Sequence, residues 1–336
     1  MAAILPVFLP FVGCGGKCVF CDQKAITKQA EPDDIIASAR QQIINWKSFT
    51  KNINEIAFYG GNFGALKPDV RQNLYSLAHE YGINGIRFST RPETITPQFI
   101  NEIKQLNVTL VELGVQSLDD RVLSLNGRPY GRQDVFNAID ALVSRSVPCG
   151  VQLMTGMYGQ SMVSCIDDAK TLAAMKISTA RIYPTQVFRN TALFNLMKNG
   201  SYVPPSFTET LIAVGGMYVV FKSENVNVIR MGLPDEAFSD GTVEAGVRHK
   251  AFGDIVKTFV TLLYFQSGGR CVFFGYKGVV KRFFPDVFPT DRNMGGIGFN
   301  QICRRVRRYF LEDSQRFFEG YADSFAKRLQ SEAYNR

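Results

Sequence analysis

Three cysteines near the N-terminus have the spacing expected of thiolates that bind a metal centre. Cys14, Cys18 and Cys21 form a C-x3-C-x2-C triplet, with glycines at positions 13, 15 and 16. A [4Fe–4S] cube normally takes four thiolates, so a cube held by these three has one iron without a protein ligand. A second molecule can bind and react at that open position. The triplet therefore predicts a reactive iron–sulfur cluster.

The spacing alone leaves two other interpretations of the triplet open. A zinc site needs a fourth cysteine or histidine close by, and the two histidines of the chain, His79 and His249, are distant in sequence. A disulfide within so short a loop leaves one thiol over and is sterically tight. We therefore favour the cluster.

The other four cysteines are scattered and show no pair spacing. We interpret them as buried, reduced thiols, which is typical of a cytoplasmic protein rather than of a disulfide framework. An auxiliary cluster is the alternative, although no C-x2-C pair supports it. These residues are Cys149, Cys165, Cys271 and Cys303.

Length and composition are those of a globular chain without a membrane span. The 336 residues are 46% hydrophobic and form one large domain or two smaller ones. No segment approaches 18 uninterrupted apolar residues. The apolar segment 4–12 contains two prolines and lacks a basic region before it, so we predict a buried strand there and not a signal peptide.

The positive charge of the chain lies mainly in its last quarter. The net charge is +8, and residues 250–336 hold 15 Lys and Arg against 8 Asp and Glu. The densest part is residues 303–309. A basic region of this kind commonly contacts phosphates, and a solvated helix face is the alternative.

Up to about residue 185, short apolar segments alternate with amphipathic helical patterns. Six strands that are each followed by a helix predict parallel βα units, either doubly wound or barrel-like. The later part is less regular, and its elements are predicted as a helix over 206–223, a strand over 226–231, a loop over 232–250, a hairpin around 268–269 and a basic helical end. The six strands are predicted at 4–12, 55–59, 86–89, 109–115, 150–154 and 180–183.

Polar and glycine-containing motifs follow the predicted strands, where the active sites of barrels gather. Gly60 and Gly61 let a ligand approach the backbone closely. Glu112 and Gln116 are four residues apart, so we expect both on one side of the fourth strand, where a ribose or a substrate can be their partner. The fork of Arg128 suits a carboxylate. Further candidates are Asn62, Ser89, Thr90, Gln152, Met154, Arg181, Tyr183 and Gln186.

The triplet and the strand-end motifs together resemble the radical S-adenosylmethionine (SAM) superfamily. The chain is most similar to the radical SAM domain of the Elongator catalytic-subunit family, and within it to short bacterial relatives that lack the acetyltransferase domain. The resemblance covers roughly residues 4–260. The motifs that carry it are Pro-Phe-Val-Gly-Cys-x3-Cys-x-Phe-Cys-Asp-Gln, Phe-Tyr-Gly-Gly-x-Phe, Ser-Thr-Arg-Pro, Glu-x-Gly-Val-Gln-Ser, Leu-x-Gly-Arg and Arg-Ile-Tyr-Pro-Thr.

This resemblance implies a partial (β/α)6 TIM-like barrel with a [4Fe–4S] cluster on the three cysteines and SAM on its open iron. We expect an α+β C-terminal extension after the barrel. SAM contacts are expected from Phe20, Gly60, Gly61, Asn62, Ser89, Thr90, Gln116, Arg128, Gln152 and Met154. Substrate contacts are expected from Glu112, Arg181, Tyr183, Gln186 and His249.

We predict a radical SAM core at residues 1–232 and a basic extension at residues 233–336, which is the candidate lid and substrate-binding region. The favoured function is reductive cleavage of SAM to a 5′-deoxyadenosyl radical that modifies RNA, above all tRNA. The alternatives are a radical SAM enzyme for a small molecule or peptide, and a non-catalytic iron–sulfur protein that binds RNA. The expected partner is a flavodoxin- or ferredoxin-like electron donor, and the expected location is the cytoplasm.

Overall fold

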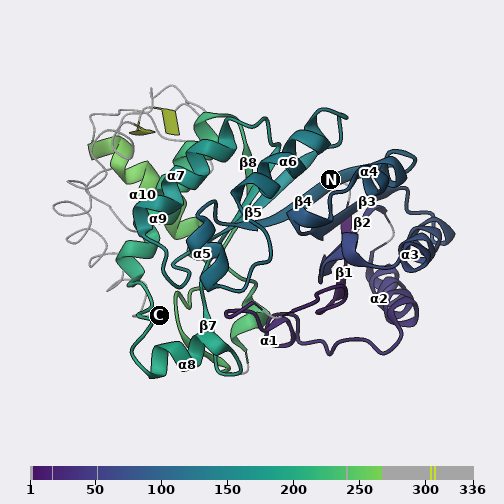
Figure 1. Cartoon of the computed structure of the whole chain (residues 1–336), viewed down its shortest axis with the longest axis horizontal. Coiled ribbons are helices and arrows are strands. Elements are labelled where there is room, and N and C mark those ends of the chain that lie inside the picture. Colours follow the sequence, from purple (N-terminus) through teal and green to yellow (C-terminus); the bar gives the residue numbers. More distant parts are fainter. Residues whose placement is uncertain are drawn as a thin grey trace.

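Seven parallel strands form one curled sheet in the computed structural model (Figure 1). The structure describes residues 3–266, apart from residues 17, 51 and 240, together with residues 303, 304, 306 and 307. The strand order across the sheet is β1-β2-β3-β4-β5-β6-β8. Their bounds are β1 (Ala3–Leu9), β2 (Ile53–Gly60), β3 (Gly85–Thr90), β4 (Val108–Gln116), β5 (Cys149–Thr155), β6 (Thr179–Pro184) and β8 (Asn227–Met231).

The strand order decides between the two predicted architectures. A doubly wound sheet reverses its order at a switch point, whereas these strands follow one another in chain order. Crossovers of one hand then place the helices on one face, and the sheet curls into a partial barrel. The predicted barrel is confirmed. The main helices are α2 (Ile35–Phe49), α3 (Pro68–Glu80), α4 (Pro97–Lys104), α5 (Asp120–Leu125), α6 (Arg132–Val143), α7 (Met162–Ala173), α9 (Phe207–Ser223) and α10 (Phe252–Gln266).

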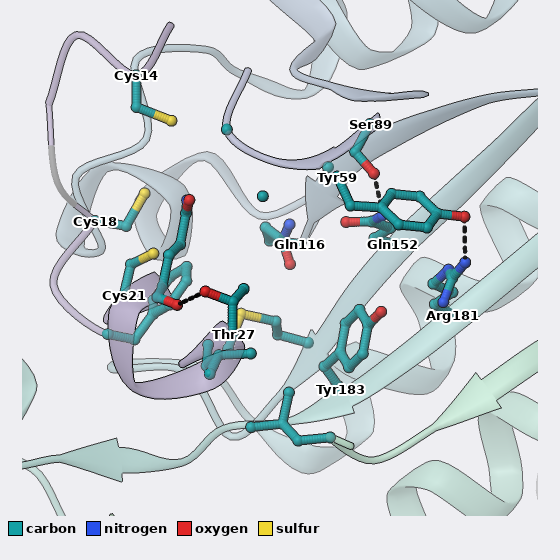
Figure 2. A pocket seen from close by; sticks show the side chains of 18 of the residues that line it. Cys14, Cys18, Cys21, Thr27, Tyr59, Ser89, Gln116, Gln152, Arg181 and Tyr183 are labelled. Atoms are coloured by element: carbon teal, nitrogen blue, oxygen red, sulfur yellow. Dashed lines mark hydrogen bonds between the residues drawn. The ribbon is translucent and has the colours of Figure 1, made fainter. Parts of the chain in front are cut away.

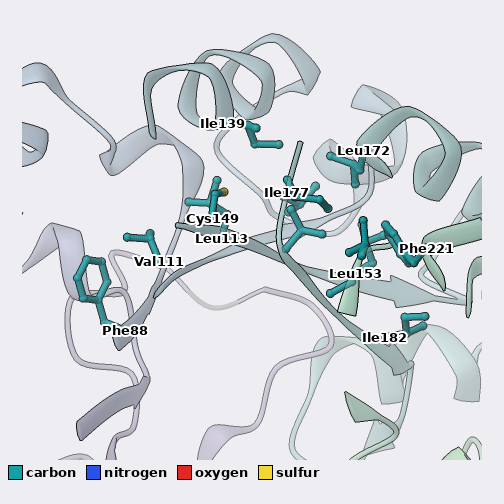
Figure 3. Packing of buried hydrophobic residues seen from close by; sticks show 14 of the residues in the cluster. Phe88, Val111, Leu113, Ile139, Cys149, Leu153, Leu172, Ile177, Ile182 and Phe221 are labelled. Carbon is teal, nitrogen blue, oxygen red and sulfur yellow. The ribbon is translucent and has the colours of Figure 1, made fainter. Parts of the chain in front are cut away.

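The core lies between the outer face of the sheet and this layer of helices. Figure 3 shows side chains of β4, β5 and β6 meeting those of α6, α7 and α9. Helix α9 is apolar on nearly every side, as expected for a helix that is enclosed by its neighbours. It begins with a capping box, in which Ser206 and Glu209 each bond the backbone amide of the other.

The predicted loop over residues 232–250 is wrong in part. It contains a 3-10 turn (Asp235–Phe238) and the short strand β9 (Val243–Ala245), which pairs antiparallel with β7 (Val187–Phe188). Val243 and Phe188 are buried together in a small apolar cluster. The short helices α1 (Gln23–Thr27) and α8 (Ala192–Lys198) were not predicted either.

Two expectations for the C-terminal part fall largely outside the described residues. The hairpin around residues 268–269 lies entirely outside them, and of the basic run 303–309 the structure describes residues 303, 304, 306 and 307. Within the described part of the chain, no helix is long and apolar enough to cross a bilayer.

A buried carboxylate ties the end of β4 to α7. The Ser117 hydroxyl donates to Oδ2 of Asp168 at 2.8 Å, and the Leu118 amide donates to the same oxygen at 3.1 Å. Asp168 is 8% exposed. Burial raises the pKa of its carboxyl group to about 6, although the two hydrogen bonds oppose the shift. The connection holds the segment that directly follows Gln116.

This raised pKa predicts a pH-dependent gain from Asp168→Asn. The contribution of Asp168 to stability is greatest below about pH 4 and declines as the pH rises through about 6, because the folded state holds the proton longer. The amide oxygen of asparagine accepts the same bonds without a charge. Since one pKa unit is about 1.4 kcal/mol, the free energy of unfolding of the variant relative to wild type should rise by about 2 kcal/mol between pH 4.5 and 7.

The matched control is Asp167→Asn, because Asp167 is the exposed neighbour on the same helix. Urea or thermal unfolding of the three proteins across this pH range measures the difference. A difference for Asp168→Asn that does not change with pH would contradict the role of the buried charge.

Candidate active site

The three N-terminal cysteines line one cavity at the carboxyl ends of the strands. Figure 2 shows the side chains of Cys14, Cys18 and Cys21 pointing toward the same space. The cavity has a volume of about 430 Å³, a size typical of a ligand site. Tight turns shape the loop, because the Cys14 amide donates to the Phe11 carbonyl and the Cys21 amide to the Cys18 carbonyl.

A close backbone contact with the end of β2 holds the cysteine loop in place. The Asn62 amide donates to the Val12 carbonyl at 2.8 Å. A Cβ atom on Gly61 would lie 1.9 Å from that carbonyl oxygen. A Cβ atom on Gly13 would lie 2.4 Å from the backbone carbonyl oxygen of Asn62. Glycine is therefore required at both positions. Gly60 and Gly61 also line the cavity. Their expected contact with SAM stays a prediction.

Asn62 has a different place from the one we predicted. Its side chain is fully buried and is not on the cavity wall. Its Oδ1 atom accepts from the Thr90 hydroxyl at 2.8 Å and from the Arg91 amide at 3.0 Å. Asn62 thus joins the ends of β2 and β3 below the loop. Its expected contact with SAM stays a prediction.

Burial and nearby cations set the electrostatics of the thiols. Burial raises the pKa of the Cys21 thiol to about 12, and it raises that of Cys14 although Arg91 opposes the shift. Nη1 of Arg128 donates to Sγ of Cys18 at 3.1 Å. Metals bind the thiolate form of cysteine, so metal binding by this loop must release the protons of the thiols. The site already contains the positive charge of Arg128.

The three thiols are the donor set of a cube with one open iron. A [4Fe–4S] cube that leaves one iron open takes three thiolates, and Cys14, Cys18 and Cys21 line the same cavity. Among the described residues, no three Cys, His, Asp or Glu side chains are grouped closely enough to hold one metal ion.

The other described cysteines give no support to an auxiliary cluster. Cys149, Cys165 and Cys303 are buried, and burial raises the pKa of each thiol to about 12. Cys271 lies outside the described residues.

Arg128 is fixed by contacts with β4 and its own loop. Its Nη2 donates to the Gly114 carbonyl at 2.7 Å, and its Nε donates to the Tyr130 hydroxyl at 2.7 Å. The guanidinium group also lies over the Tyr130 ring.

Most of the residues that we predicted to contact the cofactor line this cavity. They are Phe20, Gly60, Gly61, Ser89, Thr90, Gln116, Arg128, Gln152 and Met154.

A belt of polar side chains crosses the barrel interior on the far side of the cavity from the thiols (Figure 2). The Arg181 guanidinium group pairs with both oxygens of Glu112, and its Nη2 donates to the Tyr59 hydroxyl at 2.8 Å. The Tyr59 hydroxyl donates to Glu112 at 2.7 Å. Gln152 donates to the Ser89 hydroxyl at 3.0 Å and to Glu112 at 3.3 Å. Each of the five neighbouring strands from β2 to β6 contributes one side chain to this belt.

The belt changes the expected role of Glu112. Its side chain is 1% exposed and is not on the cavity wall, so the protein itself neutralises it and no ribose or substrate is needed. Gln116 does line the cavity, but a register shift in β4 and a φ of 67° at Gln116 break the alternation on which the expected shared side depended.

Three of the four remaining substrate candidates lie on the cavity wall, and the fourth is not among its described residues. Arg181, Tyr183 and Gln186 line the cavity, and Nε2 of Gln186 also donates to the Val247 carbonyl at 3.0 Å. His249 is not among the described lining residues. Its Nδ1 accepts from the Ala251 amide at 3.1 Å in the turn before α10, and burial lowers the pKa of its imidazole.

Sequence reasoning missed Gln23 and Tyr59. Gln23 lines the cavity, accepts a hydrogen bond from the Phe11 amide, and bonds the Cys14 and Cys21 thiols. Gln23 lies two residues after Cys21, next to the turn that ends the loop, and this proximity could have indicated a contact with the thiols. Tyr59 precedes the glycine pair, and nothing in the sequence indicated its distant partners.

Comparison with known proteins agrees with this site. A model of the radical SAM superfamily matches residues 8–172, and a model of the radical SAM C-terminal domain matches residues 177–260.

The chain belongs to the radical SAM superfamily. The predicted enzyme class is confirmed, and its cofactors are a [4Fe–4S] cluster and SAM. When bound, the cluster supplies the electron that cleaves SAM reductively. The two models meet between residues 172 and 177, whereas our boundary at residue 232 stays a prediction.

Curated relatives match over part of their length. The tRNA uridine(34) acetyltransferase of Methanocaldococcus infernus is 26% identical over 186 residues, which are 54% of this chain and 33% of that protein. The heme chaperone HemW of Bacillus subtilis is 22% identical over 215 residues, which are 60% and 56% of the two chains. This radical SAM chain thus spans less than two thirds of either relative.

Solved structures show the same fold. The archaeal Methanocaldococcus infernus Elp3 aligns with a TM-score of 0.62 at 20% identity, over 80% of this chain and 64% of that one. Coproporphyrinogen III oxidase (HemN) from Escherichia coli, a radical SAM enzyme, aligns with a TM-score of 0.50 at 16% identity, over 67% and 52%. The resemblance to an Elongator-like radical SAM protein is therefore confirmed.

The backbone contact below the cysteine loop predicts a strong effect of Gly61→Ala. The added methyl group must displace the Val12 carbonyl, which we expect to lower the free energy of unfolding by at least about 2 kcal/mol and to reduce iron incorporation severalfold. Gly15→Ala is the matched control, because nothing lies near a Cβ atom there. Iron analysis and thermal unfolding measure both effects, and equal behaviour of the two variants would refute the requirement.

The polar belt predicts non-additive effects on stability. Arg181→Met leaves the buried Glu112 carboxylate without a cation, so the free energy of unfolding should fall by about 3–5 kcal/mol. Combining it with Glu112→Gln removes the stranded charge, so the double variant should lose much less than the two single variants together. Urea unfolding tests this; Arg40→Met, at an exposed ion pair with Glu80, should change little. Additive losses would contradict the pairing.

Proposed function

We propose that this radical SAM enzyme modifies RNA, and that tRNA is its substrate. The observation that carries the proposal is the likeness to proteins that act on tRNA by name. The tRNA uridine(34) acetyltransferases of Methanocaldococcus infernus, Methanocaldococcus jannaschii and Dehalococcoides mccartyi match at 25–26% identity. The proposal covers the RNA substrate class and not acetyl transfer, because the match includes a third to about half of each relative.

The charge distribution of the chain supports RNA over a neutral small molecule. Seven of its eight net positive charges fall in residues 250–336, and polyanion binding uses such excess charge. A cavity of about 430 Å³ suits one extruded nucleotide, while the backbone on either side of it remains on the outer surface.

The chain's own residues divide the work within the cavity. We infer that Cys14, Cys18 and Cys21 bind the cluster and that Gln116 and Arg128 orient SAM beside it. The far wall, with Arg181 and Tyr183, then receives the target nucleotide. Enclosure by these walls excludes water, and the protein holds the reactants in position while the cofactors supply the difficult step.

Further proposals concern the setting of the enzyme. The reaction needs one electron per cleavage, which a flavodoxin- or ferredoxin-like protein supplies in the cytoplasm. The extension from residue 233 acts as lid and substrate-binding region; Leu233 and Pro234, its first described members on the cavity wall, support this.

Anaerobic reconstitution tests the proposed function. Wild-type protein with iron, sulfide, dithionite and SAM should form 5′-deoxyadenosine, and Cys18→Ser should lower this by at least about 100-fold through loss of the cluster. Cys149→Ala is the matched control, since that cysteine lies outside the cavity, and it should keep its full iron content. Nucleoside mass spectrometry of tRNA from cells with and without the protein should show one altered nucleoside.

The outcomes separate the alternatives. Formation of 5′-deoxyadenosine without any tRNA difference or tRNA binding would replace RNA by a small molecule or peptide. A stable cluster with RNA binding but no SAM cleavage would show a non-catalytic iron–sulfur protein.

A further inference from the structure

A second hollow adjoins the cluster cavity. It has a volume of about 440 Å³ and is formed by β8, the loop after it and the first turns of α10. Arg230, Leu233 and Pro234 line both spaces, so the two share a wall. A molecule whose one part lies in the cavity can therefore place an adjacent part in the second hollow.

The two spaces differ in chemical character. The cluster cavity is largely apolar, whereas polar atoms dominate the lining of the second hollow. Its cations are Arg230 from β8, Lys250 from the turn before α10 and Lys257 from within α10. They outnumber its two carboxylates, Asp235 and Asp254.

The cations come from separate segments that the fold brings together. Arg230 and Lys250 are exposed, and Lys257 forms an ion pair with Asp254 at 3.3 Å in which the carboxylate remains 58% exposed. The amino end of the 15-residue helix α10 faces the hollow through Gly253 and adds partial positive charge. Several flexible cations around an open polar space suit a phosphate and carry no base specificity.

We propose that this hollow, lined by Arg230, Lys250 and Lys257, binds the backbone phosphate next to the RNA nucleotide that enters the cluster cavity. The inference rests on the proposed function, because it names where the same substrate is held. The shared wall at Leu233 and Pro234 separates the phosphate from the base, and the polar hollow anchors the strand while the cavity encloses one nucleotide.

Salt-dependent tRNA binding tests the site directly. The probe is a fluorescently labelled tRNA transcript, and anisotropy is recorded with the anaerobically reconstituted full chain over a range of salt concentrations. Lys250→Gln/Lys257→Gln should weaken binding about 10-fold or more at low salt. It should also reduce the slope of log affinity against log salt by about one, because one phosphate contact contributes close to one unit.

Two further variants make the test specific. Lys67→Gln/Lys104→Gln removes the same charge from exposed positions at α3 and α4, on the opposite side of the molecule from α10 in Figure 1, and should leave both quantities unchanged. Asp254→Asn removes a negative charge from the hollow and should tighten binding severalfold. Iron content and melting temperature verify that each variant is folded.

The failures of the two proposals are distinguishable. If wild-type protein shows no salt-sensitive tRNA binding, the proposed function fails. If wild-type protein binds but the double lysine variant keeps its affinity and slope, or if the control pair weakens binding equally, the function stands and the hollow is not the phosphate site. Weaker binding by Asp254→Asn would also overturn the assignment.

Discussion

The close approach of two backbone segments determines where the chemistry of this protein can occur. The loop with the cysteines rests on the end of β2, where the Val12 carbonyl occupies the space that a side chain at position 61 would need. A hydrogen bond from the Asn62 amide fixes the register, and the Asn62 side chain extends the connection to β3. The thiols are thus held by main-chain geometry, which is stiffer than a set of side-chain contacts, and their position relative to the sheet is inherited from the strands.

The same sheet supplies the opposite wall by a different physical principle. A charged side chain inside a barrel is costly unless it is paired and hydrogen-bonded, and the belt around Glu112 satisfies this requirement with groups from neighbouring strands. The belt brings Arg181 and Tyr59 to the cavity in fixed orientations. The cavity therefore has a thiol side and a polar side, and both are attached to consecutive strands of one sheet.

Local signals in the chain were sufficient for the parallel βα units and for the cluster loop, whereas the barrel was predicted from the family resemblance. Alternating apolar segments and helical patterns predicted the strands within a few residues, and the cysteine spacing predicted the metal chemistry. Features that depend on distant partners were not predictable: the partner of Glu112 is Arg181, 69 positions away. The alternation rule assumes a regular strand, so the irregularity before Gln116 escaped it. Asn62 follows the end of β2, and nothing in the sequence indicated its partners at the end of β3. Likewise, β9 consists of three residues and exists because β7 lies beside it.

Among the residues that the structure describes, the sheet is open, and this has a mechanical consequence. Within the described residues β1 and β8 each have one neighbour, so the curl begins and ends with a strand that is bonded on one side. A closed barrel can change its diameter only by breaking or shifting ladders between strands. An open one can widen through small changes of twist that are spread over every strand pair, and all its hydrogen bonds survive. The interior can thus adapt its width to the occupant by elastic bending rather than by local unfolding.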